Sequence, residues 1–102
     1  MKNNVKKIIL FASGNGSNVE NIIKYFQNSL EVKVILVAGN NKNAQVFKRA
    51  KFHGIKTLIF DRIFFNSRLF KTIKEYEPDL IVLAGFLWKF LNHGLVIFQI
   101  KY

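Results

Sequence analysis

The sequence has no cysteine among its 102 residues. It can therefore form no disulfide, and it has no thiolate that could act as a nucleophile or as a metal ligand. Proline occurs once and glycine six times, which is too few for a low-complexity chain. Half of the residues are hydrophobic and 15% are aromatic. The composition is that of a folded domain rather than of a disordered segment.

Long apolar runs are also missing, since none approaches the ~20 residues that span a bilayer as a helix. The first run, residues 5–12, follows a basic lead, as the apolar part of a signal peptide does. It is short, and a glycine-rich loop and a polar helix follow it. We interpret it as a first strand. We expect a soluble, cytoplasmic protein with no membrane partner, and the absence of cysteine suits that reducing compartment.

Acidic residues are scarce, because six Asp and Glu face sixteen Lys and Arg and the net charge is +10. Such an excess favours anionic partners, among them phosphorylated metabolites and nucleic acid. The lysines are scattered, which is typical of a solvated surface, and no helix-turn-helix or aromatic–basic stacking motif accompanies them. A basic phosphate- or nucleic-acid-binding module without catalysis remains an alternative, although nucleic acid is the less expected partner.

Four apolar runs alternate with segments of helical spacing. The runs are residues 5–12, 31–38, 56–60 and 80–84. Alternating strands and helices are typical of a parallel sheet with helices on both faces. The pattern predicts an α/β, Rossmann-like fold of about four strands and three helices, in one domain over residues 1–102.

The three helices are expected over residues 17–28, 43–53 and 66–76. The first carries an apolar stripe at helical spacing, which comprises Val19, Ile22, Ile23 and Phe26. Gly54 suits the end of the second helix, and Pro78 prevents the third from continuing. After residue 84 the pattern weakens to a short helix over 87–91 and a last apolar run, 95–100. We expect that run to lie uncovered in a chain that is truncated.

The segment Ser13-Gly14-Asn15-Gly16-Ser17-Asn18 links the first strand to the first helix. A helix N-terminus offers unpaired N–H groups and about half a positive charge, and a glycine-rich turn lets an anion approach it. The segment therefore predicts a phosphate site. The alternative is a tight turn in which Ser17 or Asn18 caps the helix.

The class of phosphate ligand is narrowed by what surrounds this loop. Val19 stands where the dinucleotide fingerprint has its third glycine, and the second strand is followed by Gly39-Asn40-Asn41-Lys42 rather than by the acid that binds a ribose. No Lys-Ser/Thr pair follows the glycines, which excludes a Walker A loop. A mononucleotide or a sugar phosphate remains.

Residues 6 to about 91 resemble the folate-dependent glycinamide ribonucleotide formyltransferases of purine biosynthesis. The segments that carry the resemblance are Ser13-Gly14-Asn15-Gly16-Ser17-Asn18, Asn40-Asn41-Lys42-Asn43-Ala44, Arg49-Ala50, Gly54-Ile55, Ser67-Arg68 and Pro78-Asp79-Leu80-Ile81-Val82-Leu83-Ala84-Gly85-Phe86. The combination of the loop with the last segment, at this spacing, is specific. The resemblance implies a Rossmann-like domain that transfers a formyl group from 10-formyltetrahydrofolate to 5-phosphoribosylglycinamide without a metal.

The resemblance also implies site residues. Those for the ribonucleotide phosphate are Gly14, Asn15, Gly16, Ser17 and Asn18. Those for the folate are Arg68, Leu87, Trp88, Lys89 and Phe90, where an apolar strip suits a flat pterin ring. We expect a bulky residue at Gly16 to abolish phosphoribosylglycinamide binding in a chain that still folds.

Catalytic residues are not expected in this chain. The family's Asn-x-His-Pro motif follows the Gly-Phe pair by nearly twenty residues, and Asn92-His93 stands too close to Phe86 and precedes glycine. His53 is interpreted as a surface or capping residue at a helix end. The three carboxylates near Pro78 are interpreted as structural; they are Glu75, Glu77 and Asp79. A separate chain with the C-terminal half of the fold is therefore a candidate partner.

Overall fold

The computed structural model describes residues 4–86, 88–89 and 94–100, and in them five parallel strands form one sheet. The strands are β1 (Lys6–Phe11), β2 (Val32–Gly39), β3 (Thr57–Ile59), β4 (Leu80–Ala84) and β5 (Ile97–Ile100). The helices are α1 (Ser17–Phe26), α2 (Gln45–Phe52), α3 (Arg62–Ser67) and α4 (Leu69–Glu75). The strands are arranged in the sheet in the order β3-β2-β1-β4-β5. The predicted α/β, Rossmann-like architecture is confirmed.

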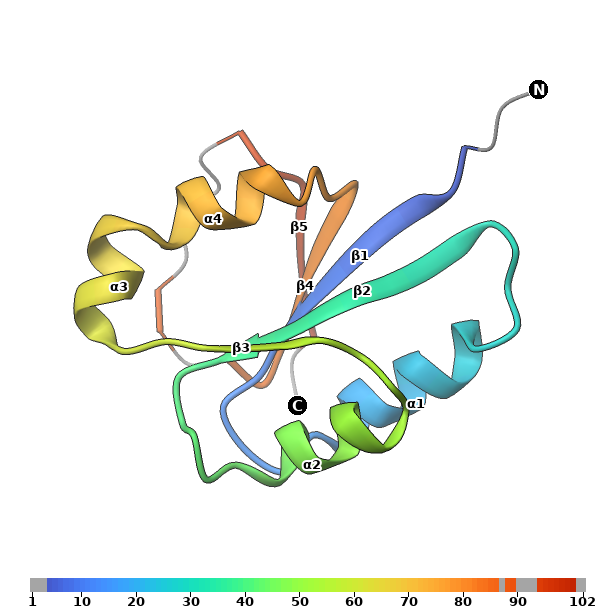
Figure 1. Ribbon diagram of the computed structural model, residues 1–102, viewed down its shortest axis with the longest axis horizontal. Helices are drawn as coiled ribbons and strands as arrows, with labels where there is room; N and C mark the ends of the chain where they lie inside the picture. The colour runs from blue at the N-terminus through green and yellow to red at the C-terminus, as the bar shows by residue number, and fades with distance from the viewer. Residues whose placement is uncertain (1–3, 87, 90–93, 101–102) are drawn as a thin grey trace.

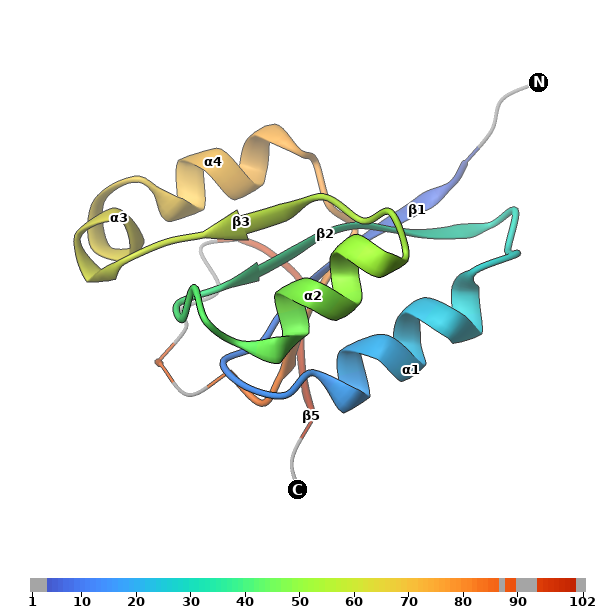
Figure 2. The same cartoon turned by 60° about the horizontal axis from the view of Figure 1, so that its bottom comes forward.

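The helices lie in two layers, with α1 and α2 on one face of the sheet and α3 and α4 on the other (Figures 1 and 2). Strand β1 pairs with β2 and β4 along its two edges, and the two helix layers bury its two faces. Its Leu10 packs in the cluster that includes Val19 of α1, and its Ile9 in the cluster that includes Leu69 of α4. Near-continuous apolar strands are what two covered faces require.

The third predicted helix is wrong in its start, because two helices occupy this stretch. The side chain of Asp61 accepts a hydrogen bond of 2.9 Å from the backbone N–H of Phe64 and caps α3, which therefore begins at Arg62. The backbone leaves the helical region at Arg68 (φ −123°), and α4 follows. The apolar residues of α3 lack the clear periodicity on which the sequence-based boundary depended.

The last apolar run forms a fifth strand, which the sequence pattern did not predict. Strand β5 pairs in parallel with β4, from Ile81 opposite Ile97 to Ala84 opposite Ile100. The expectation of an uncovered run holds only in part. Val96 is 64% exposed and Phe98 is 59% exposed, whereas Leu95, Ile97 and Ile100 pack against the core clusters. Of the short helix expected over residues 87–91, residues 87, 90 and 91 lie outside the described residues.

The chain reverses its direction of progress across the sheet at β1, with β2 and β3 on one side and β4 and β5 on the other. In open parallel sheets, ligands bind outside the carboxyl ends of the strands at such a switch point. The loop after β1 lies at that place. In the part of the chain that the structure describes, no helix has the length and apolarity to cross a membrane.

Candidate anion-binding site

Gly16 fixes the turn from β1 into α1. It is the N-cap of α1 and has a left-handed backbone, with φ of 84°. A Cβ at this position would lie 2.5 Å from Cγ2 of Val46 and 2.7 Å from its Cα. Both the backbone and the space therefore require glycine. A bulky residue at Gly16 would therefore strain the fold, so such a variant does not separate a loss of ligand binding from a loss of stability.

The N-terminus of α1 has no side-chain cap. Ser17 is the first helical residue, the N–H of Glu20 donates to the carbonyl of Gly16 at 2.8 Å, and no side-chain oxygen caps the turn. The interpretation of Ser17 or Asn18 as a helix cap is therefore wrong. The first N–H groups of a helix have no partner within it, so those of α1 are available to an anion, and the helix dipole favours a negative charge there.

Two hydrogen bonds tie this loop to the segment that follows β2. The hydroxyl of Ser13 donates to Oδ1 of Asn40 at 2.9 Å. The backbone N–H of Val46 donates to the carbonyl of Gly14 at 3.2 Å. The segments that resemble the formyltransferases after the first and second strands are thus brought together at the carboxyl end of the sheet.

Arg49 of α2 holds the loop from the side. Its Nε donates to the backbone oxygen of Asn15 at 2.9 Å, and its Nη2 donates to Oδ1 of the same residue at 2.8 Å. Its Nη1 forms an ion pair with Oε1 of Glu20. Asn15, one of the predicted substrate residues, is thereby fixed by Arg49.

The second oxygen of Glu20 contacts His53, with Nε2 and Oε2 separated by 2.9 Å. The side chains of Glu20 and His53 are 19% and 13% exposed. His53 occupies the C-cap position of α2, which confirms the capping alternative rather than the surface one. Glu20 was not identified from the sequence; the i, i+4 spacing of Arg49 and His53 on one helix was the available signal.

The bond to His53, and next the bond to Arg49, hold the pKa of the Glu20 carboxyl below its ordinary value of 4.5. The positive charges of Arg49 and Lys24 act in the same direction. Glu20 is therefore ionised at neutral pH, and it faces cationic or hydrogen-bonding groups on the adjacent helix.

Of the predicted folate residues, Arg68 and Trp88 lie on the other face of the sheet, with α3 and α4. Trp88 is half-buried. The centroid of its ring lies 5.1 Å from the ring centroid of Phe65 and 3.7 Å from Cζ of Arg62. Arg68 and Lys89 are exposed, Arg68 at the junction of α3 and α4. Leu87 and Phe90 lie outside the described residues. The stacking of Arg62 on Trp88 was not foreseen.

The carboxylates around Pro78 lie at the opposite, amino end of the sheet. The backbone N–H of Lys7 donates to Oδ2 of Asp79 at 2.8 Å, and the N–H of Asp79 donates to the carbonyl of Lys7 at 2.8 Å. Nζ of Lys7 lies 4.0 Å from Glu77. These groups join the starts of β1 and β4, which confirms a structural role for Asp79.

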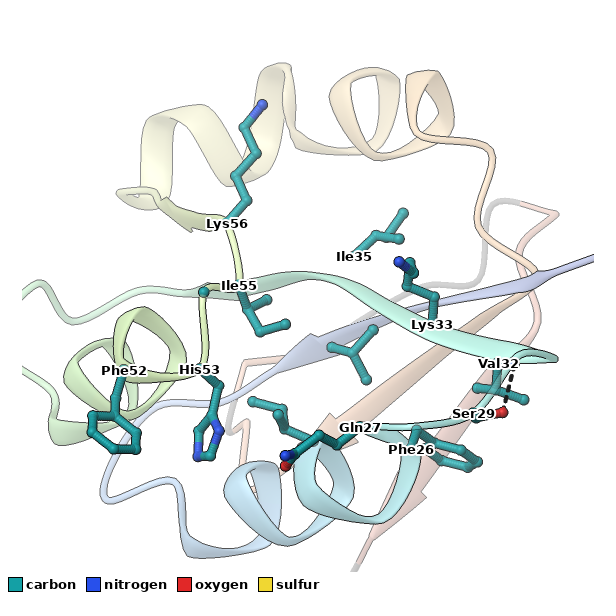
Figure 3. A pocket seen from close by; sticks show the side chains of 13 residues that line it. Phe26, Gln27, Ser29, Val32, Lys33, Ile35, Phe52, His53, Ile55 and Lys56 are labelled. Carbon is teal, nitrogen blue, oxygen red and sulfur yellow. Dashed lines mark hydrogen bonds between the residues drawn. The ribbon is translucent and has the colours of Figure 1, made fainter.

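A pocket of about 710 Å³ also lies at the amino end of the sheet, beneath β2 and between the C-terminal ends of α1 and α2 (Figure 3). Phe26 of α1, Val32 of β2 and Ile55 line it, and His53 joins its wall from α2 (Figure 3). The loop of residues 13–18 does not line this pocket. Among the described residues, no group of three potential ligands from His, Asp and Glu could hold a metal ion.

Known proteins similar to this chain are formyltransferases. The chain is 37% identical over 87 residues to the phosphoribosylglycinamide formyltransferase of Escherichia coli K12, which covers 78% of this chain. The crystal structure of the Coxiella burnetii phosphoribosylglycinamide formyltransferase is 39% identical, with a TM-score of 0.75 over 86% of this chain. That of Campylobacter jejuni is 35% identical, with a TM-score of 0.75 over 85%.

The similarity extends over only part of these relatives. The chain spans 41% of the E. coli protein, 44% of the Coxiella chain and 51% of the Campylobacter chain. Within the chain itself, the match to a sequence model of the formyl transferase family extends over residues 6–99. It includes the uncapped loop, the Arg49 contacts, strands β1 to β4 and all but the last residue of β5, and the chain therefore belongs to the formyl transferase family.

Proposed function

We propose that the chain binds the phosphate of 5-phosphoribosylglycinamide at the loop of residues 13–18. The observation that carries the proposal is the N-terminus of α1, which follows a glycine-rich turn at the switch point of the sheet and has no side-chain cap. Gly14 is exposed, and no other atom lies within 4 Å of a Cβ built there. A phosphate oxygen can therefore approach the backbone N–H groups of Ser17 and Asn18. The names of the relatives support this ligand.

The proposed reaction is transfer of the formyl group of 10-formyltetrahydrofolate to the ligand's amine, in cytoplasmic purine biosynthesis. The proposed folate contacts are Arg68, Leu87, Trp88, Lys89 and Phe90. Trp88 supports this assignment because its ring is half-buried and the residue follows the carboxyl end of β4, the end of the sheet at which ligands bind. We assign no metal to the reaction.

Formyl transfer also needs a group that stabilises the oxyanion at the formyl carbonyl and a group that accepts the amine's proton. His53 is the only histidine in the described residues, and its Nε2 contacts Glu20. We therefore propose that residues 1–102 provide the phosphoribosyl-binding part of the domain. The catalytic groups would come from the part of the relatives' length that this chain does not span, supplied for example by a separate polypeptide.

The test is calorimetric titration of the chain with 5-phosphoribosylglycinamide and with the same riboside without its phosphate. Gly14→Leu places a side chain in open space at the loop without a left-handed backbone. It should weaken binding at least about tenfold, or about 1.4 kcal/mol, and leave the melting temperature nearly unchanged. Gln27→Leu, at the opposite end of α1, is the matched control and should bind like the wild type.

Equal affinity for the two ribosides, or an unchanged affinity of Gly14→Leu, would contradict the proposed site. The alternative of a basic nucleic-acid-binding module makes a different prediction. It requires binding of an oligonucleotide that weakens steeply as salt increases, because phosphate contacts release counterions. A competition assay between an oligonucleotide and phosphoribosylglycinamide, run at about 50 and about 200 mM salt, separates the two functions. Only a nucleic-acid-binding module would bind the oligonucleotide and lose it steeply at the higher salt.

A further inference from the structure

The guanidinium of Arg49 joins the phosphate-binding loop to the body of α1. Two of its nitrogens donate to Asn15, one to the backbone oxygen and one to the side-chain oxygen. A third is paired with Glu20. The planar fork of an arginine fixes two such partners in one geometry, which a lysine cannot do. The orientation of Arg49 therefore sets where the Asn15 peptide lies.

Glu20 is held equally firmly. Its Oε1 is paired with Arg49 of α2 and its Oε2 with His53, the C-cap of that helix. Each carboxylate oxygen thus has a partner of its own, and the side chain is only 19% exposed. The orientation of Arg49 depends on an acceptor that is itself fixed.

The charge of Glu20 is unfavourable for an anion site. It lies in the first turn of α1, near the N–H groups that would hold a phosphate, and like charges repel. Simple electrostatics therefore predicts that removal of this carboxylate strengthens anion binding. The presence of a carboxylate here is explained instead by its pairing with Arg49, which binds Asn15 of the loop.

We propose that Glu20 is a positioning residue for the phosphate-binding loop, acting through Arg49 on the Asn15 peptide. The proposal rests on the proposed function for the identity of the ligand, but the ordering of the loop can be measured without any ligand. The expected role is to hold Asn15, Gly16 and Ser17 in the geometry in which the first N–H groups of α1 converge on one anion.

The first experiment is amide hydrogen exchange of the free chain, residue by residue, in Glu20→Gln, Glu20→Ala and Arg49→Lys. The amide of Val46, which donates to the carbonyl of Gly14 in the loop, should exchange about tenfold faster in Glu20→Ala and Arg49→Lys, since local openings have their own free energies. Glu20→Gln should lie between these variants and the wild type, because an amide oxygen still accepts from Arg49. Amides of β1 should be unchanged. Unchanged exchange at the Val46 amide, or equal acceleration in β1, would overturn the proposal.

The second experiment measures the affinity for 5-phosphoribosylglycinamide and asks whether loss of the Glu20 carboxylate strengthens or weakens binding. Glu31→Gln removes the same charge from an exposed position and serves as the matched control. If Glu20 acts only through its charge, both variants bind more tightly. The positioning role predicts about tenfold weaker binding for Glu20→Ala, no loss for Glu31→Gln, and little further loss when Glu20→Ala is added to Arg49→Lys.

The two proposals can fail separately. A wild-type chain that does not bind phosphoribosylglycinamide refutes the proposed function, and hydrogen exchange still decides the role of Glu20. A wild-type chain that binds, with exchange of the Val46 amide unaltered in every variant, refutes the role of Glu20 and leaves the proposed function in place. Tighter binding of Glu20→Ala would also overturn the positioning role.

Discussion

Replacement of Gly16 by alanine should destabilise the chain much more than the same replacement at Gly14. An L-residue in the left-handed region costs about 1–2 kcal/mol, and Gly16 has φ of 84°. The added methyl would also lie 2.5–2.7 Å from Cγ2, Cβ and Cα of Val46. Overpacking of this kind costs about 1–3 kcal/mol. Together these effects predict a loss of about 2–5 kcal/mol in the free energy of unfolding.

Such a loss is large for a domain whose whole stability is about 5–15 kcal/mol. Urea denaturation followed by circular dichroism measures it directly. Gly14→Ala is the matched control, since its Cβ meets no atom within 4 Å and its backbone is not left-handed, and it should change stability by less than about 0.5 kcal/mol. Val46→Ala should not rescue Gly16→Ala, because the Cα and Cβ of residue 46 remain in place. Equal stabilities of the two glycine variants would refute the reasoning.

Three further predictions concern the cap of α3, the titration of Glu20 and the edge strand. Asp61→Ala removes the N-cap of α3 and should cost about 1 kcal/mol, or about 4–8 °C in melting temperature; Asp61→Asn retains a capping oxygen and should cost much less in the same thermal melt. The lowered pKa of Glu20 means that its stabilising contribution is present above pH 4.5 and is lost as pH falls through the lowered pKa; in urea titrations at pH 7 and pH 3, the stability difference between wild type and Glu20→Gln should therefore shrink at the lower pH, and a constant difference would contradict this. Phe98→Lys should reduce binding of a hydrophobic dye, because Phe98 is 59% exposed beside the exposed Val96; unchanged dye fluorescence would exclude this strand as the binding surface.

The sequence pattern was most reliable where the signal is local. The run of residues 80–84 coincides with β4, and the glycine-rich loop places the start of α1 at Ser17, as observed. The boundary between α3 and α4 at Arg68 was missed. The cap at Asp61 and the break in the backbone at Arg68 each depend on a single residue, and the aromatic residues between them show no periodicity that marks either place. Strand β5 was missed because a short apolar run near the end of the sequence has no following helix to mark it.

The supporting contacts of the site could not be predicted for a different reason. Glu20 and Arg49 are 29 residues apart, and Asn15 and Arg49 are 34 apart. Such contacts depend on the angle at which two helices cross the same face of the sheet, which no local pattern encodes. The loop itself was identified because its glycines are adjacent in sequence. The groups that hold it were not.

The second helix therefore has a larger part in the site than its apolar pattern suggests. Val46, Arg49 and His53 recur at the spacing of one helical face, and each makes a contact with the loop or with α1. Val46 lies against Gly16, Arg49 binds Asn15, and His53 binds the carboxylate that holds Arg49. Because α1 and α2 lie side by side on one face of the sheet (Figure 2), a shift of α2 would move the loop with it. The geometry of the phosphate site is thus determined as much by this face of α2 as by the glycine-rich sequence that first identified it.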